Sequence, residues 1–172
     1  KKNEIIYAGR ISSEKGVEQL IIAFKKSELK NFKLKIIGTG PDEKILKQKY
    51  SSNNILFLGE IRNELVLDLI SESMAVVTAT KLYEGQPTLL CEASLLGIPS
   101  IFPRAGGISE FFPENTVLSF EQNNVDDLTK KLNLLLDRNI IDKEGINNYS
   151  YISEYLDEES LINKFDSVIN SE

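Results

Sequence analysis

The regular alternation of short apolar runs with amphipathic segments of helical period is the feature of this sequence that most restricts its fold. The apolar runs predict strands at residues 4–8, 34–37, 54–58, 74–79, 98–102 and 116–120. Between and after these runs, apolar residues recur at helical spacing, which predicts helices at residues 17–27, 42–50, 64–72, 88–96, 124–137, 140–150 and 153–169. The alternation indicates an α/β protein, because each helix must cover the sheet that its neighbouring strands build.

The expected fold is a Rossmann-like, doubly wound parallel sheet of about six strands with helices on both faces. The strand order predicted for it is 3-2-1-4-5-6. In this order the first and fourth strands are neighbours at the switch point, where ligands bind beyond the carboxyl ends of the strands. The loops after these two strands, residues 9–16 and 81–88, are therefore expected to open onto one crevice.

Capping and core residues can be assigned within these elements. We expect Asn63 and Asn124 to cap the helices that follow them, because asparagine accepts hydrogen bonds from the first helical N–H groups. Gly145 is expected to weaken the helix predicted at residues 140–150. The residues expected to face the core are Val17, Leu20, Ile21 and Phe24, then Val66, Leu69 and Ile70, and finally Leu128, Leu132, Leu135 and Leu136.

Composition excludes several kinds of function. The chain has 172 residues, enough for one well-buried domain, and a net charge of −6, which argues against binding to the phosphate backbone of DNA or RNA. It has no histidine and a single cysteine, Cys91, so a zinc site, a Ser-His-Asp triad and an internal disulfide are excluded within this chain. A lone thiol fits a reducing compartment, and no apolar stretch approaches the ~20 residues that span a membrane. We therefore expect a soluble, cytoplasmic protein.

Residues 83–100 are the stretch with the clearest chemistry. A Gly/Pro turn leads into the helix predicted at residues 88–96, with Glu84 in the turn and Glu92 about one turn inside the helix. Both carboxylates can face the space in front of the helical N–H groups. Glu92 has leucine neighbours, where an ionised carboxylate is costly unless it is hydrogen-bonded, and sugar or ribose hydroxyls are suitable donors. The alternative is that Glu92 lies at an exposed helix edge or caps a neighbouring loop.

A second candidate site lies in residues 9–16, between the first strand and the first helix. A glycine-containing turn before a helix N-terminus readily binds anions. Arg10 can bind phosphate oxygens with its planar guanidinium, and Lys15 can act as a point charge. The same two cations could instead be ordinary residues of a solvated loop. The expected meeting of this loop with Glu84 at one crevice favours the binding interpretation.

Several motifs follow one another in a fixed order: Gly9-Arg10, Glu14-Lys15-Gly16, Gly38-Thr39-Gly40-Pro41, Phe57-Leu58-Gly59, and Glu84 with Glu92, followed by Gly97-Ile98-Pro99. This set resembles the C-terminal, donor-binding domain of retaining glycosyltransferases with the GT-B fold, in the large family 4 that includes bacterial polysaccharide and lipopolysaccharide transferases. The resemblance covers about residues 4–137. It implies that residues 1–172 form one nucleotide-sugar-binding domain, and that an N-terminal acceptor domain is absent.

The resemblance also implies roles for individual residues. Arg10, Lys15 and Glu84 would be catalytic: the two cations would bind the donor diphosphate and stabilise it as leaving group, and Glu84 would contact the donor sugar. Glu92 would hold the ribose hydroxyls, and the backbone near Gly59 and Glu60 would meet the base. The donor-binding set is Gly9, Gly38, Gly40, Gly59, Glu60, Gly85, Gln86, Pro87, Thr88, Leu89 and Glu92. No cofactor or metal is expected, because the cations and the helix N-terminus can neutralise a diphosphate.

Two positions depart from the family pattern. The family usually has a phenylalanine or a similar residue after the Glu-Gly pair, whereas this chain has Gln86, which could add a hydrogen bond to the sugar. The family often has an acidic residue before its later Gly-Gly pair, whereas here Arg104-Ala105 precede it. The identity of the donor therefore does not transfer from the family to this chain.

The implied function is transfer of a sugar, with retention, from a UDP- or GDP-sugar to a glycan or lipid-linked acceptor in cell-surface polysaccharide biosynthesis, such as that of capsule or lipopolysaccharide. The acceptor would bind through the N-terminal domain, so this chain alone should bind donor weakly and be inactive; the full-length enzyme could associate peripherally with the membrane. Two alternatives stay open. One is a nucleotide-sugar epimerase or a sugar-phosphate synthase of the same fold. The other is a non-catalytic α/β binding module, in which replacing Glu84 or Glu92 by alanine would leave ligand affinity unchanged.

Overall fold

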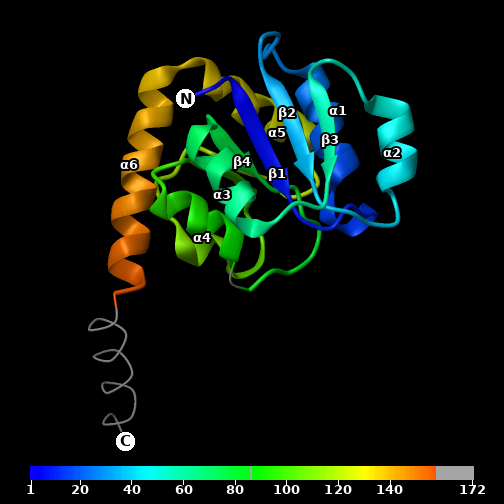
Figure 1. The fold of residues 1–172 in the computed structure, drawn as a ribbon. Helices are drawn as coiled ribbons and strands as arrows, with labels where there is room; N and C mark the ends of the chain where they lie inside the picture. The colour runs from blue at the N-terminus through cyan, green and yellow to red at the C-terminus, as the bar shows by residue number, and fades with distance from the viewer. Residues whose placement is uncertain (86, 158–172) are drawn as a thin grey trace, which may run out of the picture.

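Six strands form one parallel sheet in the order β3-β2-β1-β4-β5-β6 (Figure 1). The computed structural model describes residues 1–85 and 87–157. The strands are β1 Glu4–Ala8, β2 Lys33–Ile37, β3 Ile55–Gly59, β4 Ala75–Val77, β5 Ser100–Pro103 and β6 Ser119–Phe120. β1 lies at the centre of the sheet, between β2 and β4. The order and the parallel direction of every pairing between these strands confirm the predicted topology.

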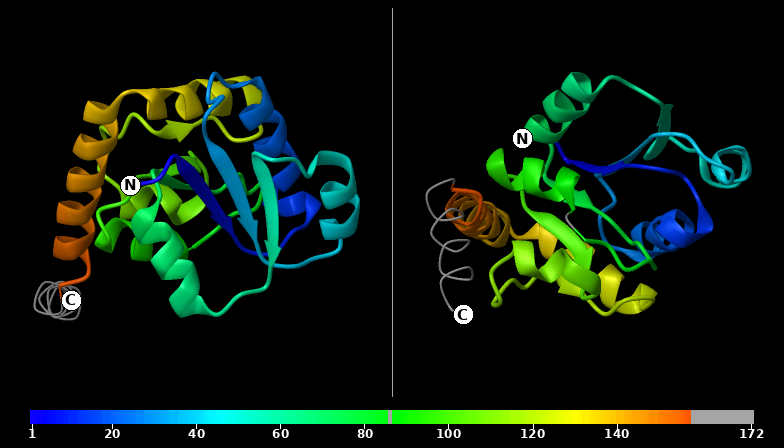
Figure 2. Two further views of the ribbon diagram at one scale, coloured as in Figure 1. Left: turned by 45° about the horizontal axis from the view of Figure 1, so that its top comes forward. Right: turned by 90° about the horizontal axis from the view of Figure 1, so that it is seen from below.

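Helices cover both faces of this sheet (Figure 2). They are α1 Val17–Lys26, α2 Glu43–Tyr50, α3 Asn63–Glu72, α4 Thr88–Leu95, α5 Val125–Asn133 and α6 Arg138–Tyr155, with 3-10 turns η1 Ser13–Lys15, η2 Gly106–Phe111 and η3 Leu134–Leu136. Successive strand residues point to opposite faces. Ile5 and Tyr7 therefore join the core cluster that includes α1 and α5, whereas Ile6 joins the cluster that includes α3 and α4.

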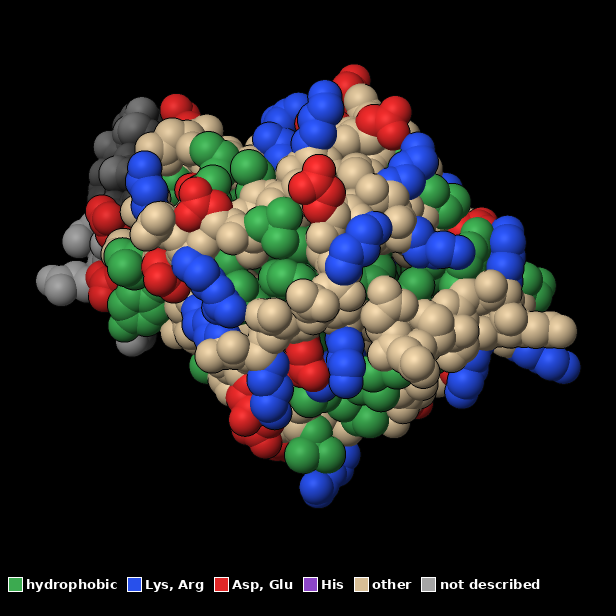
Figure 3. Space-filling view, turned by 90° about the horizontal axis from the view of Figure 1, so that it is seen from above, with side chains coloured by type: hydrophobic (Ala, Val, Ile, Leu, Met, Phe, Trp, Pro, Cys, Tyr) green, Lys and Arg blue, Asp and Glu red, His purple; other side chains and the backbone are tan. Residues whose placement is uncertain are grey.

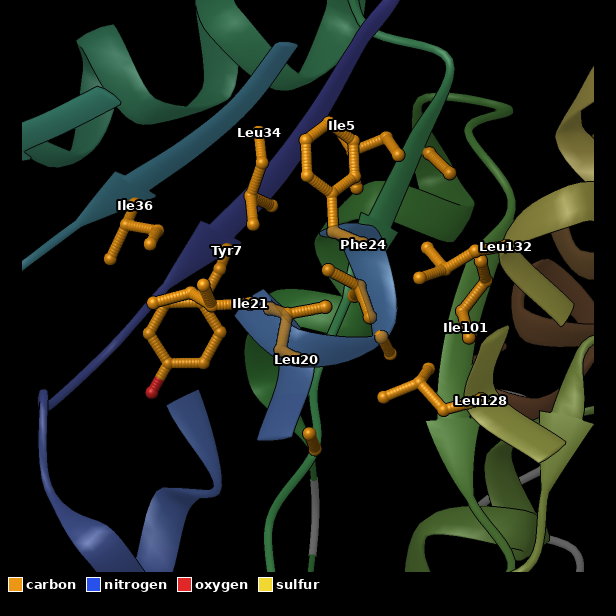
Figure 4. Close-up of a cluster of buried hydrophobic side chains, with 14 of the residues drawn as sticks. Ile5, Tyr7, Leu20, Ile21, Phe24, Leu34, Ile36, Ile101, Leu128 and Leu132 are labelled. Atoms are coloured by element: carbon orange, nitrogen blue, oxygen red, sulfur yellow. The ribbon is translucent and has the colours of Figure 1, made fainter. Parts of the chain in front are cut away.

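The larger core lies between the sheet and α1 with α5 (Figure 4). The inward faces predicted for these helices are confirmed, since residues such as Leu20, Phe24, Leu128 and Leu132 are buried. Leu136 is the exception, with 51% of the residue exposed. α5 ends at Asn133 and continues as the tighter turn η3, which rotates Leu136 away from the α-helical stripe.

Several boundaries of helices and strands differ from the predicted ones because residues at the ends of these elements form local hydrogen bonds. Asn63 is not a cap: α3 begins at Asn63 itself, and Arg62 occupies the N-cap position without a side-chain bond. Asn124 does cap α5, accepting from the N–H of Asp127 at 2.9 Å. β5 begins later than predicted because the N–H of Ile98 bonds back to the end of α4, at the carbonyl of Ala93. β6 is shorter because the hydroxyl of Thr116 accepts from the N–H of Leu118, which forms a local turn.

One continuous helix runs past the predicted boundary between the last two helices. α6 runs from Arg138 to Tyr155 without a break at Gly145. A Cβ atom at Gly145 would lie 2.5 Å from the carbonyl oxygen of Gly97, so the glycine permits close packing of α6 on the turn after α4. The remainder of the second predicted helix, residues 158–169, lies outside the described residues. Within residues 1–85 and 87–157, no helix combines the length and the apolar character needed to cross a membrane.

The face at the amino ends of the strands carries basic and acidic side chains interspersed (Figure 3). At this edge Lys2 forms an ion pair with the exposed Glu72 at the end of α3. Arg138 contacts Asn3 and Met74, which directly precede β1 and β4. The residues predicted to bind ligand lie at the other end of the strands.

Candidate functional site

The carboxyl ends of β1 and β4 meet at a cavity of about 190 Å³. Its lining includes Gly9, Arg10 and Lys15 from the loop after β1, and Glu84, Thr88 and Leu89 from the loop after β4 and the start of α4. These segments are far apart in the sequence, and they open onto one crevice as the strand order predicts. The three residues predicted as catalytic, Arg10, Lys15 and Glu84, therefore line the same cavity.

A second, larger cavity of about 690 Å³ adjoins the first. It shares Gly9 and Arg10 with the first cavity and extends past Gly38 and Gly40 to Glu60, beyond the ends of β2 and β3. Together the two cavities form a continuous crevice along the carboxyl edge of the sheet, with Arg10 at the junction. Four further residues of the predicted donor set line it: Gly38, Gly40, Glu60 and Pro87.

Close backbone contacts hold the turns around this crevice together. A Cβ at Gly38 would lie 2.1 Å from the carbonyl oxygen of Gly9, and one at Gly40 would lie 2.2 Å from that of Ile11. Only glycine allows the turn after β2 to lie this close to the loop after β1. The N–H of Ile11 then bonds to the carbonyl of Thr39 at 2.9 Å. The Gly38-Thr39-Gly40-Pro41 turn is thus an element of close backbone packing.

A hydrogen bond from Tyr7 holds the loop that carries Arg10. The Tyr7 hydroxyl donates to the carbonyl oxygen of Arg10 at 2.8 Å. Burial raises the pKa of Tyr7, and the nearby charges of Glu84 and Glu14 raise it further, so the phenol remains a donor. The backbone of Arg10 is therefore held in place while its side chain is exposed at the cavity.

Lys15 and Glu84 form an ion pair across the cavity. The Lys15 Nζ lies 2.5 Å from Oε1 of Glu84, and the two side chains are 29% and 28% exposed. Thr80 donates a second hydrogen bond to the same oxygen at 2.9 Å. Burial opposes ionisation of Glu84, but the hydrogen bonds from Lys15 and Thr80 hold the pKa of its carboxyl below the usual value. The sequence predicted separate partners for these two residues, and the structure pairs them with each other.

The start of α4 supplies backbone donors to the same cavity. Pro87 is the N-cap residue, and its carbonyl accepts from the N–H groups of Leu90 and Cys91. The first N–H groups of a helix have no acceptor within it, and Thr88 and Leu89, which carry the first such groups of α4, line the cavity. Together with Arg10 and Lys15, this helix end makes the crevice suited to an anion.

The structure does not bring every predicted residue to the crevice. Glu92 is half-buried one turn into α4 and lines neither cavity, so its role toward ribose stays a prediction. Gly85 lies in the exposed loop, and Gly59 bonds through its carbonyl to the N–H of Gly38 at 2.8 Å. Gln86 lies outside the described residues. Arg104 also points elsewhere: it donates to the carbonyl of Ser119 at 3.0 Å.

Sequence reasoning missed several residues that shape the crevice. Tyr7, Thr78 and Ile108 line the smaller cavity, and Thr80 lies beneath Glu84. Tyr7 could have been found, since strand alternation puts it on the same face as Ile5, two residues before Gly9. No local signal identifies Ile108, because η2 reaches the cavity only through the tertiary fold.

The side chains that line the crevice supply charged groups and hydroxyls. In the part of the chain that the structure describes, no group of three or more Asp, Glu, His or Cys side chains is arranged to hold a metal ion. Cys91 is a buried residue of α4 itself, with 4% of the residue exposed. Burial raises the pKa of its thiol to about 11, and the charge of Glu92 adds to this effect.

Comparison with known proteins identifies the family. The model of the family described as "Glycosyl transferases group 1" matches residues 1–155. The chain belongs to the glycosyl transferases group 1 family. Membership agrees with the fold, since the parallel sheet with helices on both faces is that of a domain of GT-B glycosyltransferases.

Curated relatives match this group 1 chain over most of its length. It is 25% identical to the protein CapJ of Staphylococcus aureus over 95% of its own length and 43% of CapJ. It is 28% identical to the amylovoran biosynthesis glycosyltransferase AmsD of Erwinia amylovora over 79% of its own length and 39% of AmsD. The chain thus spans less than half the length of these curated relatives.

Solved structures share the fold of this group 1 chain at lower identity. HepE of Anabaena in complex with UDP has a TM-score of 0.82 and 18% identity, covering 99% of this chain and 49% of that one. The protein TarM has a TM-score of 0.80 and 22% identity, covering 98% of this chain and 35% of that one. At these identities the likeness establishes the fold.

Proposed function

We propose that this chain is the donor-binding domain of a glycosyltransferase and that it binds a nucleoside diphosphate sugar in the crevice beyond β1 and β4. The observation that carries the proposal is the joint lining of one cavity by Arg10, Lys15 and Glu84 with the first residues of α4. The crevice thereby combines two cations, a helix N-terminus and a carboxylate. This is the combination that a diphosphate linked to a polyol requires.

The diphosphate would bind to Arg10, Lys15 and the first N–H groups of α4, those of Thr88 and Leu89. Charge-assisted hydrogen bonds contribute roughly 1.5–3 kcal/mol each, and a helix N-terminus adds roughly 0.3–2 kcal/mol. A few such contacts reach the ~4–8 kcal/mol of millimolar to micromolar affinity. The same groups would stabilise the charge that develops on the leaving diphosphate. We therefore propose a metal-independent reaction in which the protein supplies the positive charge.

Glu84 would bind hydroxyls of the donor sugar once Lys15 turns toward the diphosphate. In the structure Lys15 holds Oε1 of Glu84 at 2.5 Å. A diphosphate competes for the same ammonium group, because it carries more negative charge than one carboxylate. Donor binding would thus exchange one ion pair for another and release Glu84 toward the sugar. The larger adjoining cavity, which reaches Glu60, has room for the nucleoside.

The family and its relatives support a proposal for the activity of the whole protein. We propose transfer with retention to a glycan or lipid-linked acceptor in cell-surface polysaccharide synthesis. AmsD, a glycosyltransferase of amylovoran biosynthesis, supports the polysaccharide assignment, and the complexes of HepE with UDP and UDP-glucose support a UDP-sugar. Because the chain spans 43% of CapJ, we propose that residues 1–172 form one domain and that the acceptor binds to another part of the protein. The domain alone would bind donor without transferring sugar, and the buried thiol of Cys91 fits a cytoplasmic reaction.

Calorimetric titration with UDP and with GDP tests the proposal. One of the two nucleotides should bind with millimolar to micromolar affinity, and Arg10→Ala should weaken that binding about tenfold or more, as loss of a charge-assisted contact requires. Arg138→Ala is the matched control, because Arg138 lies at the opposite edge of the sheet, where it contacts Asn3. Absence of binding by both nucleotides at millimolar concentration would exclude the proposal. Equal loss in the two arginine variants would remove the assignment of Arg10.

A further inference from the structure

The hydroxyl of Thr80 lies beneath Glu84 and is directed at it. Thr80 is 1% exposed. Its hydroxyl accepts a hydrogen bond from the N–H of Leu82 at 3.2 Å and donates one to Oε1 of Glu84 at 2.9 Å. Because a backbone N–H can only donate, the hydroxyl proton is left to point at the carboxylate. The direction of this contact is therefore set by the backbone.

The backbone around Thr80 is anchored on both sides. The carbonyl of Thr80 accepts from the side-chain amide of Gln122 at 3.2 Å, and the N–H of Lys81 donates to the carbonyl of Glu14 at 2.8 Å. A Cβ at Gly16 would lie 1.9 Å from the carbonyl oxygen of Ala79, so the loop after β1 packs directly on this segment. Thr80 is thus a fixed point between the two loops that line the cavity.

Glu84 itself is held through its backbone as well. Its carbonyl accepts from the N–H of Gly107 at 2.8 Å. Both side-chain contacts, from Lys15 and from Thr80, fall on Oε1. Oε2 accepts no hydrogen bond from any residue in the described ranges 1–85 and 87–157. One oxygen of the carboxylate is thereby anchored, and the other is available to a ligand.

Lys15 and Thr80 respond differently to a bound diphosphate. The diphosphate attracts the charged Lys15. The hydroxyl of Thr80 is neutral and buried, so its hydrogen bond to Glu84 is expected to persist when the diphosphate binds. We propose that Thr80 is a positioning residue that keeps Oε1 of Glu84 engaged and presents Oε2 to a hydroxyl of the donor sugar. This inference rests on the proposed function, in which Glu84 binds the sugar. Thr80 should accordingly affect recognition of the sugar and leave recognition of the nucleoside diphosphate unchanged.

The test compares nucleotides with nucleotide sugars in Thr80 variants. Thr80→Val keeps the shape of the side chain and removes the hydroxyl, whereas Thr80→Ser keeps the hydroxyl. UDP, GDP, UDP-glucose and GDP-mannose are titrated by calorimetry into each protein. For each nucleotide sugar, its affinity is compared with that of the corresponding nucleoside diphosphate, and the pair with the larger difference in the wild type is used to compare the variants. Thr80→Val should shrink this difference about tenfold, as expected for one hydrogen bond to a charged group. The affinity for the diphosphate alone should not change, and Thr80→Ser should behave like the wild type.

Thr116→Val is a matched control, because Thr116 makes the same kind of contacts away from the crevice. Its hydroxyl accepts from the N–H of Leu118 at 3.3 Å and donates to Oε2 of Glu144 at 2.6 Å. Thr116→Val should lose stability in the same way as Thr80→Val and should bind all four ligands like the wild type. Where Thr80→Val does not fold, as judged by circular dichroism, Thr80→Ala against Thr80→Ser makes the same comparison.

Each outcome distinguishes the inference from the function on which it rests. If the wild type binds neither diphosphate nor any nucleotide sugar, the proposed function fails and the role of Thr80 fails with it. If the wild type binds but shows no difference between sugar and diphosphate, or if Thr80→Val weakens both equally, the positioning role is overturned while donor binding stands. A selective loss in Thr80→Val, restored by serine, supports the inference.

Discussion

Replacing Glu84 by glutamine should strengthen the binding of UDP, although Glu84 lines the cavity that we propose for the donor. In the structure a diphosphate must first take Lys15 from Glu84, whose Oε1 lies 2.5 Å from Nζ. Exposed ion pairs contribute about 0.2–1 kcal/mol, and this pair is 29% and 28% exposed, so we assign it the upper end, about 1 kcal/mol. Removing that competition should lower the dissociation constant for UDP about fivefold. The substitution also removes the repulsion between the negative carboxylate of Glu84 and the diphosphate, which strengthens UDP binding further.

Calorimetric titration of UDP into the wild type and Glu84→Gln measures this effect. The control is Glu72→Gln, which makes the same change in net charge and breaks the ion pair of Glu72 with Lys2 at the opposite edge of the sheet. Glu72→Gln should leave the affinity for UDP unchanged, and raising the salt concentration should reduce the gain in Glu84→Gln. The reasoning is refuted if Glu84→Gln binds UDP no more tightly than the wild type. An equal gain in Glu72→Gln would attribute the effect to net charge instead of to the Lys15 pair.

Two further predictions concern the packing around α4. Gly145→Ala should destabilise the protein by about 1–3 kcal/mol in urea unfolding, through overpacking. An alanine in an ordinary helix interior would instead stabilise it by about 1 kcal/mol. The loss is expected because the new Cβ would lie 2.5 Å from the carbonyl oxygen of Gly97. A free energy of unfolding equal to or above that of the wild type would contradict this packing. The control is Ser150→Ala, at an exposed position of α6. Cys91 should react slowly with a thiol reagent at pH 8, because its pKa is raised to about 11 and the thiolate is the reactive form, and the rate should increase with pH toward 11 and on unfolding in urea. Rapid labelling of the native protein at pH 8 would show that the thiol is accessible.

The element order and the sheet topology were predictable because they depend on local patterns and on general rules of connection. Apolar periodicity identifies β1 and α1, and right-handed crossovers then leave few strand orders for such a chain. The boundaries that moved did so where a polar group forms a hydrogen bond with a residue only a few positions away, in place of continuing the predicted strand. The N–H of Ile98, which closes α4, and the hydroxyl of Thr116, which forms a turn, are examples.

The candidate site was predictable in its place and only partly in its composition. The switch-point rule brings the loops of Arg10 and Glu84 together whatever their side chains do. It does not say which side chains reach the cavity, because that depends on their direction. Glu92, one turn into α4, lines neither cavity, whereas Tyr7 and Thr80, which carry no motif, support the backbone of Arg10 and the carboxylate of Glu84.

The sequence by itself determined the class of fold, the order of the strands and the meeting of two polar loops at one edge of the sheet, since these follow from residue periodicity and chain chirality. Only the tertiary structure decided that Lys15 pairs with Glu84, that Thr80 holds the same oxygen, and that Gly145 is a packing contact. The contact of Thr80 joins residues four positions apart and depends on how the loop between them folds. The other two join atoms from segments far apart in the sequence, whose separation is set by the packing of the whole domain. Contacts of this kind have no local signal, because a side chain's neighbours across a fold are determined by distances of a few ångströms that no spacing along the chain encodes.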